Sequence, residues 1–238
     1  MITGIAVGVP ARDEIESIDA CIGSIIVAAE AVGLPVSIVV VADSCTDGTA
    51  ARARAALRSA RLPCRVVDRR FGRVGPTRDL ACRMAIGLHP ATLSERVWLA
   101  TTDADSRVPH DWLVAHLRHE AAGWDGVAGL IEFADGDLTP ELRSRFLAAI
   151  ERDGTGTGHP HVHGANLGIK ASTFFAAGGF ADVAVGEDQQ LWREARRLGY
   201  SVVGTTDGVV TTSARRAGRA PGGLASFLQE LSCSDSRQ

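Results

Sequence analysis

Short apolar runs alternate with helix-length segments along the first half of the chain, and this alternation limits the fold more than any other feature. The apolar runs cover residues 5–9, 36–42, 65–67 and 97–100. Each has the length of a strand, and the segments between them have the spacing of amphipathic helices. Strands joined by single helices pair in parallel, because each helix returns the chain to the same edge of the sheet. We therefore predict an α/β fold with a doubly wound, mainly parallel sheet of Rossmann-like type, flanked by helices.

Helices and further strands complete this prediction. The expected helices lie at 16–32, 50–59, 77–87, 112–122, 141–152, 171–177, 189–198 and 221–231. The further strands lie at 126–133, 200–204 and 209–212, and the glycine-rich residues 153–160 are expected to form a loop. A chain of 238 residues has the length of one large α/β domain. We therefore expect a single domain over 1–238.

Charge and composition exclude several classes of protein. The net charge of −3 gives no reason to expect nucleic-acid binding. No apolar run approaches the ~20 residues of a membrane-spanning helix, so no integral membrane segment is expected. The five cysteines are odd in number and none are spaced as a metal or redox pair, which is typical of free thiols in the cytoplasm. The glycine patterns of dinucleotide-binding proteins and of P-loops are absent.

Two carboxylates one residue apart follow the fourth apolar run. Asp103 and Asp105 come just after residues 97–100, so they lie at the carboxyl edge of the predicted sheet, where open α/β sheets bind ligands. Carboxylate oxygens suit Mg²⁺ or Mn²⁺, which complete their coordination with water and substrate phosphates. The alternative is an acidic turn in which Asp105 caps the next helix. The spacing alone leaves both interpretations open.

Other polar residues fall at the same edge. Asp43 ends the second strand too far before the next helix to cap it, so its carboxylate can accept a hydrogen bond from a ribose hydroxyl or a base N–H. Asp47 or Thr49, in contrast, is well placed to cap that helix. The glycine- and arginine-rich residues 71–78 either cradle an anion or simply begin a helix. Glu187 and Asp188 open a later helix, where the helix dipole also favours acids.

Six motifs, in this order, resemble those of the family 2 nucleotide-diphospho-sugar glycosyltransferases, which have the GT-A fold. They lie at 9–14, 43–49, 75–79, 103–105, 164–166 with 178–180, and 187–188. Asp13 stands where the family commonly has Asn, and Ser44 and Cys45 depart from the family's order in the second motif. The shared order along almost the whole chain carries the resemblance.

The resemblance implies a nucleotide-sugar pocket and a metal site. The pocket residues would be Pro10, Ala11, Arg12, Glu14, Asp43, Arg78, Asp103 and Ala104. Within the pocket, Asp43 is expected to bind the base, often uracil, and Arg78 to approach the base or the phosphates. Asp105 is expected to ligate a divalent cation, Mn²⁺ or Mg²⁺. Asp103 would hold the same ion, a metal-bound water or the ribose.

The resemblance also implies an acceptor side. Asp188 is the expected general base, and Glu187 is its neighbour or the alternative base. Further candidates for the acceptor site, or for a lid over the diphosphate, are His161, His163, Gly164, Asn166, Arg215, Arg216 and Arg219. The alternative interpretation of the two histidines is a purely structural role. The alternative interpretation of the three arginines is a solvated basic tail.

Together these roles imply an inverting, metal-dependent glycosyltransferase. It would move a sugar from a nucleoside-diphosphate sugar, UDP-sugar favoured, to a hydroxyl of a small or carrier-linked acceptor. Residues 1–105 would form the donor half and 106–238 the acceptor half, and association into a homodimer is left open. A sugar-phosphate nucleotidyltransferase is one alternative, but residues 10–14 lack the glycine-rich loop of such enzymes. A non-catalytic nucleotide-sugar-binding module is the other, which the intact acidic residues oppose.

Overall fold

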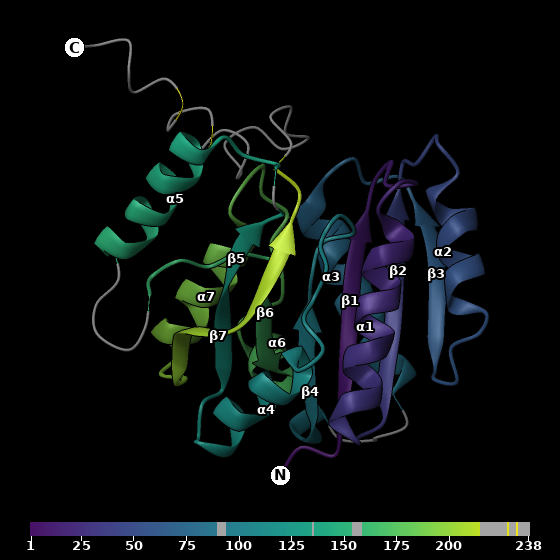
Figure 1. The fold of residues 1–238 in the computed structure, drawn as a ribbon. Coiled ribbons are helices and arrows are strands. Elements are labelled where there is room, and N and C mark those ends of the chain that lie inside the picture. Colours follow the sequence, from purple (N-terminus) through teal and green to yellow (C-terminus); the bar gives the residue numbers. More distant parts are fainter. Residues whose placement is uncertain (90–93, 135, 154–158, 215–227, 229–231, 233–238) are drawn as a thin grey trace.

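The structure, a computed structural model, describes residues 1–89, 94–134, 136–153, 159–214, 228 and 232. Seven strands form one sheet in the order β3-β2-β1-β4-β6-β5-β7 (Figure 1). The strands are β1 (Gly4–Ala11), β2 (Val36–Asp43), β3 (Cys64–Arg69), β4 (Val97–Thr101), β5 (Gly126–Phe133), β6 (Leu167–Lys170) and β7 (Val202–Thr212). The helices are α1 (Ile18–Val32), α2 (Thr49–Leu57), α3 (Val74–Leu88), α4 (Trp112–Ala121), α5 (Pro140–Asp153), α6 (Ala171–Ala176) and α7 (Glu187–Arg197). The predicted α/β class is confirmed.

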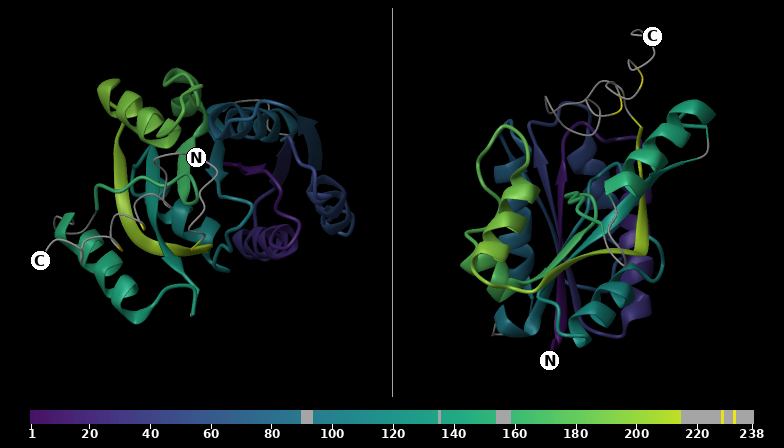
Figure 2. Two further views of the ribbon diagram at one scale, coloured as in Figure 1. Left: turned by 90° about the horizontal axis from the view of Figure 1, so that it is seen from above. Right: turned by 90° about the vertical axis from the view of Figure 1, so that its left-hand side faces the viewer.

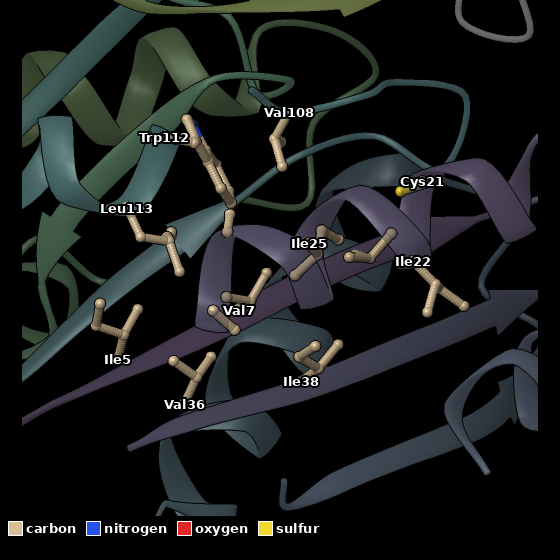
Figure 3. Close-up of a cluster of buried hydrophobic side chains, with 14 of the residues drawn as sticks. Ile5, Val7, Cys21, Ile22, Ile25, Val36, Ile38, Val108, Trp112 and Leu113 are labelled. Atoms are coloured by element: carbon tan, nitrogen blue, oxygen red, sulfur yellow. The ribbon is translucent and has the colours of Figure 1, made fainter. Parts of the chain in front are cut away.

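The central strands are buried on both faces, which explains their continuous apolar sequences. Every residue of β1 and β2 is buried. Helices α1, α2 and α4 cover one face of the sheet, and α3, α6 and α7 cover the other (Figure 2). On the first face, Ile22 and Ile25 of α1 pack against Val7 and Ile38 of the strands (Figure 3). The core thus forms one layer on each side of the sheet, and the polar loops gather at the strand ends.

Strand β6 runs antiparallel to its neighbours β4 and β5, and the sequence predicted no strand there. It pairs with β4 from Trp98↔Lys170 to Thr101↔Leu167. Because β6 is antiparallel, the chain enters it at the edge where β4 ends. The residues before β6, 163–166, therefore lie beside the residues that follow β4. The sheet is mixed, and this reversal brings the second half of the chain to the carboxyl edge.

Strand β1 continues through Pro10 to Ala11, whereas the sequence predicted that it stops at Pro10. The N–H of Ile5 bonds toward β2, so the even-numbered residues of β1 direct their N–H groups toward β4. Strand β4 pairs with β1 only as far as Gly8. The N–H that Pro10 lacks would therefore meet no strand, and the proline is tolerated.

The end of the chain differs from the prediction in a further way. The sequence predicted two short strands at 200–204 and 209–212, but the structure has one strand, β7. The pairing of β7 with β5 is irregular between Gly129 and Ile131 of β5. The expected helix at 221–231 and most of the expected loop at 153–160 lie outside the described residues. Leu228 is described, and it is buried with Leu142 and Phe146 of α5. None of the described helices has the length and apolar content that crossing a bilayer requires.

A polar network crosses the core beneath the carboxyl edge. The Trp98 indole N–H donates to His116 Nδ1 (3.3 Å), and the Trp112 indole N–H donates to Asn166 Oδ1 (2.9 Å). The Asn166 amide also donates to backbone carbonyls of β5 and β7. Within the described structure, His116 Nε2 has no hydrogen-bond partner. Burial, aided by the charge of His119, lowers the pKa of His116 to about 4.

We expect His116 to make the fold less stable in acid. The unfolded chain binds a proton at a histidine pKa of about 6.5, whereas folded His116 stays neutral until about pH 4, so the free energy of unfolding falls as the pH decreases between these values. The part due to His116 is on the order of 3 kcal/mol. In urea unfolding at about pH 7 and about pH 4, H116Q should lose less stability than the wild type. H110Q replaces an exposed histidine and should lose as much as the wild type. Equal losses in H116Q and the wild type would contradict this expectation.

Candidate functional site

The candidate site lies at the edge where β1, β2 and β4 end. Asp43 is the last residue of β2, Arg12 follows β1, and Asp103 and Asp105 follow β4. Neighbouring strands therefore bring these four residues to one edge. Three further residues expected in the nucleotide pocket are buried within this framework: Pro10, Ala11 and Ala104.

Arg78 of α3 is the centre of the site. Its side chain is 3% exposed. Nε donates to Glu187 Oε1 (3.2 Å), and Nη2 donates to Asp103 Oδ1 (2.8 Å). Nη1 donates to the Thr101 hydroxyl (3.2 Å) and to the Gly164 carbonyl (2.9 Å). One guanidinium thus joins the end of β4, the segment before β6 and the first turn of α7.

The surroundings of Arg78 stabilise its positive charge. Burial lowers the pKa of the guanidinium, but the carboxylates of Asp103, Glu187 and Asp188 outweigh this effect and raise the pKa above its ordinary value. The guanidinium carbon lies 5.7 Å from the ring centroid of Phe180, within the range of cation–π attraction. The sequence predicted Arg78 as a contact of the base or phosphates, and here its nitrogens bond to protein groups.

Asp188 is held on both of its carboxylate oxygens. Oδ2 accepts the N–H of Gly164 (2.7 Å), and Oδ1 accepts the N–H of Gln189 (2.7 Å). Burial and the neighbouring Glu187 raise the pKa of Asp188 to about 6, against the opposite effects of Arg78 and the two amides. Such a carboxylate is ionised at neutral pH and has a pKa suited to accepting a proton. Glu187 is buried and turned toward Arg78, so the two adjacent acids face different partners.

Asp43 is held by the loop that follows β3. Its Oδ1 accepts the backbone N–H groups of Phe71 (2.7 Å) and Gly72 (3.1 Å) and the hydroxyl of Ser44 (3.1 Å). Arg12 donates to the Gly72 carbonyl (3.4 Å), so the loops after β1, β2 and β3 meet. No group in the described part of the chain bonds to Oδ2 of Asp43, which leaves that oxygen to accept an N–H or O–H of a ligand.

Side chains lock the loop after β1 to the loop after β2. Asp47 Oδ2 accepts the N–H of Ile15 (3.0 Å), and Oδ1 accepts the N–H of Thr49 (2.9 Å) at the start of α2. The Thr49 hydroxyl accepts the N–H of Glu14 (2.7 Å). The N-cap position of α2 is Gly48 rather than Asp47 or Thr49, and Asp47, one residue before it, accepts the N–H of the first helical residue. Glu14 is fixed at the edge by its backbone.

Two groups of residues have oxygen or sulfur atoms that could hold a cation. Asp103 and Asp105 are partly exposed, and two carboxylates with water and a diphosphate match the oxygen ligands of Mg²⁺ or Mn²⁺. Asp13, Cys45 and Asp47 also have possible ligand atoms within 4.8 Å of one another. However, the carboxylates of Asp13 and Asp47 already accept backbone N–H groups, which accounts for this cluster without an ion. Asp103 also accepts a hydrogen bond, from Arg78, but on Oδ1 alone, whereas both oxygens of Asp47 accept N–H groups. The donor set at Asp103 and Asp105 therefore fits the predicted metal better.

The residues predicted for the acceptor side fall in different places. His161 and His163 lie in the segment that leads to Gly164, and their nearly parallel rings have centroids 6.1 Å apart. Burial lowers the pKa of His163 to about 4. Gly164 lies at the centre, between Arg78 and Asp188. Asn166 is fully buried, and its amide bonds within the polar network, so we leave it out of the site. The remaining candidates lie outside the described residues: Arg215, Arg216 and Arg219.

The sequence did not predict every residue of the site. Thr101 accepts a hydrogen bond from Arg78, and Phe180 packs against the same guanidinium. Asp79 positions Phe180, because its Oδ1 accepts the Phe180 N–H (3.0 Å). At Gly179 a Cβ would lie 2.2 Å from the Asp79 carboxylate, and the φ of 79° also favours glycine. Asp79 and Phe180 each lie in one of the sequence motifs, at 75–79 and 178–180. Only the folded structure shows that these two motifs contact each other.

These features define an α/β protein with acidic residues gathered around a buried arginine at the carboxyl edge of a mixed sheet. The sequence model of glycosyl transferase family 2 matches residues 6–176, and the chain belongs to this family. No curated protein matches it significantly in sequence.

Several solved structures share the fold. Residues 1–349 of TarS from S. aureus, in complex with UDP-GlcNAc, match with a TM-score of 0.65 and 16% identity over 97% of this chain and 64% of that one. Mannosyltransferase PcManGT from Pyrobaculum calidifontis, with GDP-Man and Mn²⁺, gives 0.64 and 20% over 98% and 70%. Glucosyl-3-phosphoglycerate synthase from Mycobacterium tuberculosis, with Mg²⁺ and UDP, gives 0.53 and 22% over 90% and 72%. The chain thus has the GT-A fold, and it spans less than two thirds of the TarS chain.

Proposed function

We propose that this protein transfers a sugar from a nucleoside-diphosphate sugar to a hydroxyl group of an acceptor. The observation that carries the proposal is the convergence of Asp103, Glu187 and Asp188 on the buried Arg78, at the ligand-binding edge of a family 2 fold. The similar structures contain UDP-GlcNAc, GDP-Man or UDP. These ligands support nucleotide sugars as the class of donor.

Asp188 is the proposed general base. The acceptor hydroxyl must lose its proton as its oxygen attacks the sugar, and an ionised carboxylate can accept that proton. The two amides that bond to Asp188 hold its carboxylate in one orientation. Its pKa of about 6 leaves it ionised at neutral pH while keeping it a stronger base than an ordinary aspartate. Glu187 is the weaker candidate, because its carboxylate is paired with Arg78.

The donor side is proposed to consist of Arg12, Glu14, Asp43 and Asp103, at the ends of β1, β2 and β4. Oδ2 of Asp43 suits a base that offers a single N–H, as uracil does, and we favour a UDP-sugar for this reason. Residues 1–105 would then bind the donor, and 106–238 would supply Asp188 and the acceptor site.

Asp105 and Asp103 are the residues that would hold Mn²⁺ or Mg²⁺. When bound, such an ion neutralises the charge that develops on the leaving diphosphate. One base opposite one leaving group favours a single in-line displacement, in which the acceptor oxygen bonds to the sugar carbon as the bond to the diphosphate breaks. This reaction inverts the configuration at that carbon.

The cysteines and the aromatic content support a proposal for the cellular compartment and the size of the acceptor. The four described cysteines are free thiols, which supports a cytoplasmic protein. The low content of aromatic residues, 5%, provides few rings on which a long polysaccharide could stack. A small acceptor, or the head group of a carrier, is therefore the proposed partner.

A thermal-shift screen of nucleoside diphosphates, with and without Mn²⁺, tests the proposed binding. A ligand that binds only the folded state raises the melting temperature. We expect UDP with Mn²⁺ to raise it more than UDP alone or Mn²⁺ alone. The absence of a shift with every nucleoside diphosphate, with Mn²⁺ present, would contradict the proposal.

A further inference from the structure

We propose that Arg78 is a positioning residue, which fixes the Asp188 carboxylate relative to Asp103 through the Gly164 peptide and Glu187. In this role it acts through protein groups and does not contact the donor. The role rests on the glycosyl transfer proposed above, because it concerns the orientation of the proposed base.

The first link runs through a single residue. The Gly164 carbonyl accepts a hydrogen bond from Arg78 Nη1 (2.9 Å), and the Gly164 N–H donates to Asp188 Oδ2 (2.7 Å). The position of Gly164 thus determines where one oxygen of the base lies. The second link runs through Glu187, whose Oε1 accepts from Arg78 Nε (3.2 Å) and whose backbone continues directly into Asp188.

The arrangement requires both an arginine and a glycine. Arg78 makes four of the five hydrogen bonds that a guanidinium can donate. Lysine keeps the charge but lacks this planar fork. A Cβ on Gly164 would lie 2.6 Å from Arg78 Cζ, so even alanine would displace the guanidinium or the peptide.

Helix α3 holds Arg78 in place from outside the network. Gly75, in the first turn of α3, has no side chain, and a Cβ there would lie 2.2 Å from the Ala181 carbonyl oxygen. Asp79 holds Phe180, whose ring lies against the Arg78 guanidinium. The helix is therefore fastened to the segment before α7, and the site has little freedom to rearrange around a smaller side chain.

The charges around Asp188 determine how its protonation responds to Arg78. Glu187 on its own helix raises the pKa of Asp188, and Arg78 from α3 lowers it. Asp103, which follows β4, pairs with Arg78, and His163 precedes Gly164 in the neighbouring segment. Removing the positive charge of Arg78 leaves Asp188 without the positive charge that offsets Glu187, so the base should hold its proton to higher pH.

Steady-state kinetics of R78K, R78M and G164A, with saturating donor, test this role. We expect R78K and G164A to lower kcat about 10²-fold, because each misplaces the base, with a smaller change in the KM for the donor. We expect R78M to move the acidic midpoint of the kcat–pH profile upward by about one unit. R83M removes another arginine of α3 that also pairs with a carboxylate, Asp79, and should leave the midpoint unchanged.

Each outcome separates the role of Arg78 from the proposed function. A wild type that transfers no sugar would contradict the function itself. With an active wild type, an unchanged midpoint in R78M, or a raised donor KM at unchanged kcat, would overturn the positioning role. If R78M does not fold, as judged by its melting curve, R78K and G164A decide, and full kcat in both would overturn the role.

Discussion

Replacing Asp188 by Asn is expected to lower kcat for sugar transfer by about 10²–10⁴-fold. Asn has nearly the same shape but only one acceptor oxygen, so it keeps one of the hydrogen bonds from the amides of Gly164 and Gln189. It cannot take the proton of the acceptor hydroxyl. The measurement is the initial rate of transfer with donor and acceptor at saturation. D182N, in the segment before α7, is the matched control, because Asp182 is 53% exposed and pairs with Arg73. D182N should keep the wild-type rate.

The pH dependence of the wild type should report the same residue. Because Asp188 must be ionised to accept a proton, kcat/KM should rise with pH through a midpoint near its pKa of about 6. Below that pH the carboxylate is protonated and the rate falls. D188N should lose this acidic limb. A D188N enzyme with the wild-type rate, or with the same acidic limb, would contradict the role of Asp188 as the base.

Replacing Asp105 by Ala is expected to lower transfer by about 10³-fold or more. The substitution removes one of the two carboxylates proposed to hold the cation, so negative charge would build up on the leaving diphosphate without compensation. Isothermal titration of UDP with and without Mn²⁺ checks the cause independently of turnover. Mn²⁺ should tighten UDP binding by the wild type and have no such effect on D105A.

D111A provides the control for this substitution. Asp111 is an exposed acid six residues after Asp105, just before α4. Mn²⁺ should therefore tighten UDP binding by D111A as much as by the wild type. Full activity of the wild type in the presence of a chelator, or Mn²⁺-dependent UDP binding by D105A, would contradict the proposed metal site.

The sequence predicted the parts of the fold that depend on local pattern. Strands buried on both faces have continuous apolar sequences, as in β1 and β2, and the helices between them have a clear apolar face. The parallel half of the sheet follows from these elements. Strand β6 could not be predicted in this way, because four residues that include a glycine carry no periodicity. Its antiparallel direction depends on pairing with β4, which lies far away in the sequence.

The site divides along the same line. Residues at strand ends, such as Asp43, Asp103 and Asp105, could be placed at one edge because parallel strands share that edge. The contacts of Arg78 could not be predicted, since they join segments more than 80 residues apart to a single guanidinium. The burial of Asn166 could not be predicted either, because a motif shows the type of a residue and not the direction of its side chain. Tertiary contacts determine that direction.

The most direct measurement of the central claim is the release of nucleoside diphosphate from a panel of nucleoside-diphosphate sugars, with Mn²⁺ and a mixture of hydroxyl acceptors. We predict that the wild type releases nucleoside diphosphate from at least one donor, with a UDP-sugar as the best substrate, and that D188N releases it at least about 10²-fold more slowly. Binding of the donors without any release would instead indicate a non-catalytic binding module. Release of pyrophosphate from a nucleoside triphosphate, with no transfer from any sugar nucleotide, would contradict the account and indicate a nucleotidyltransferase.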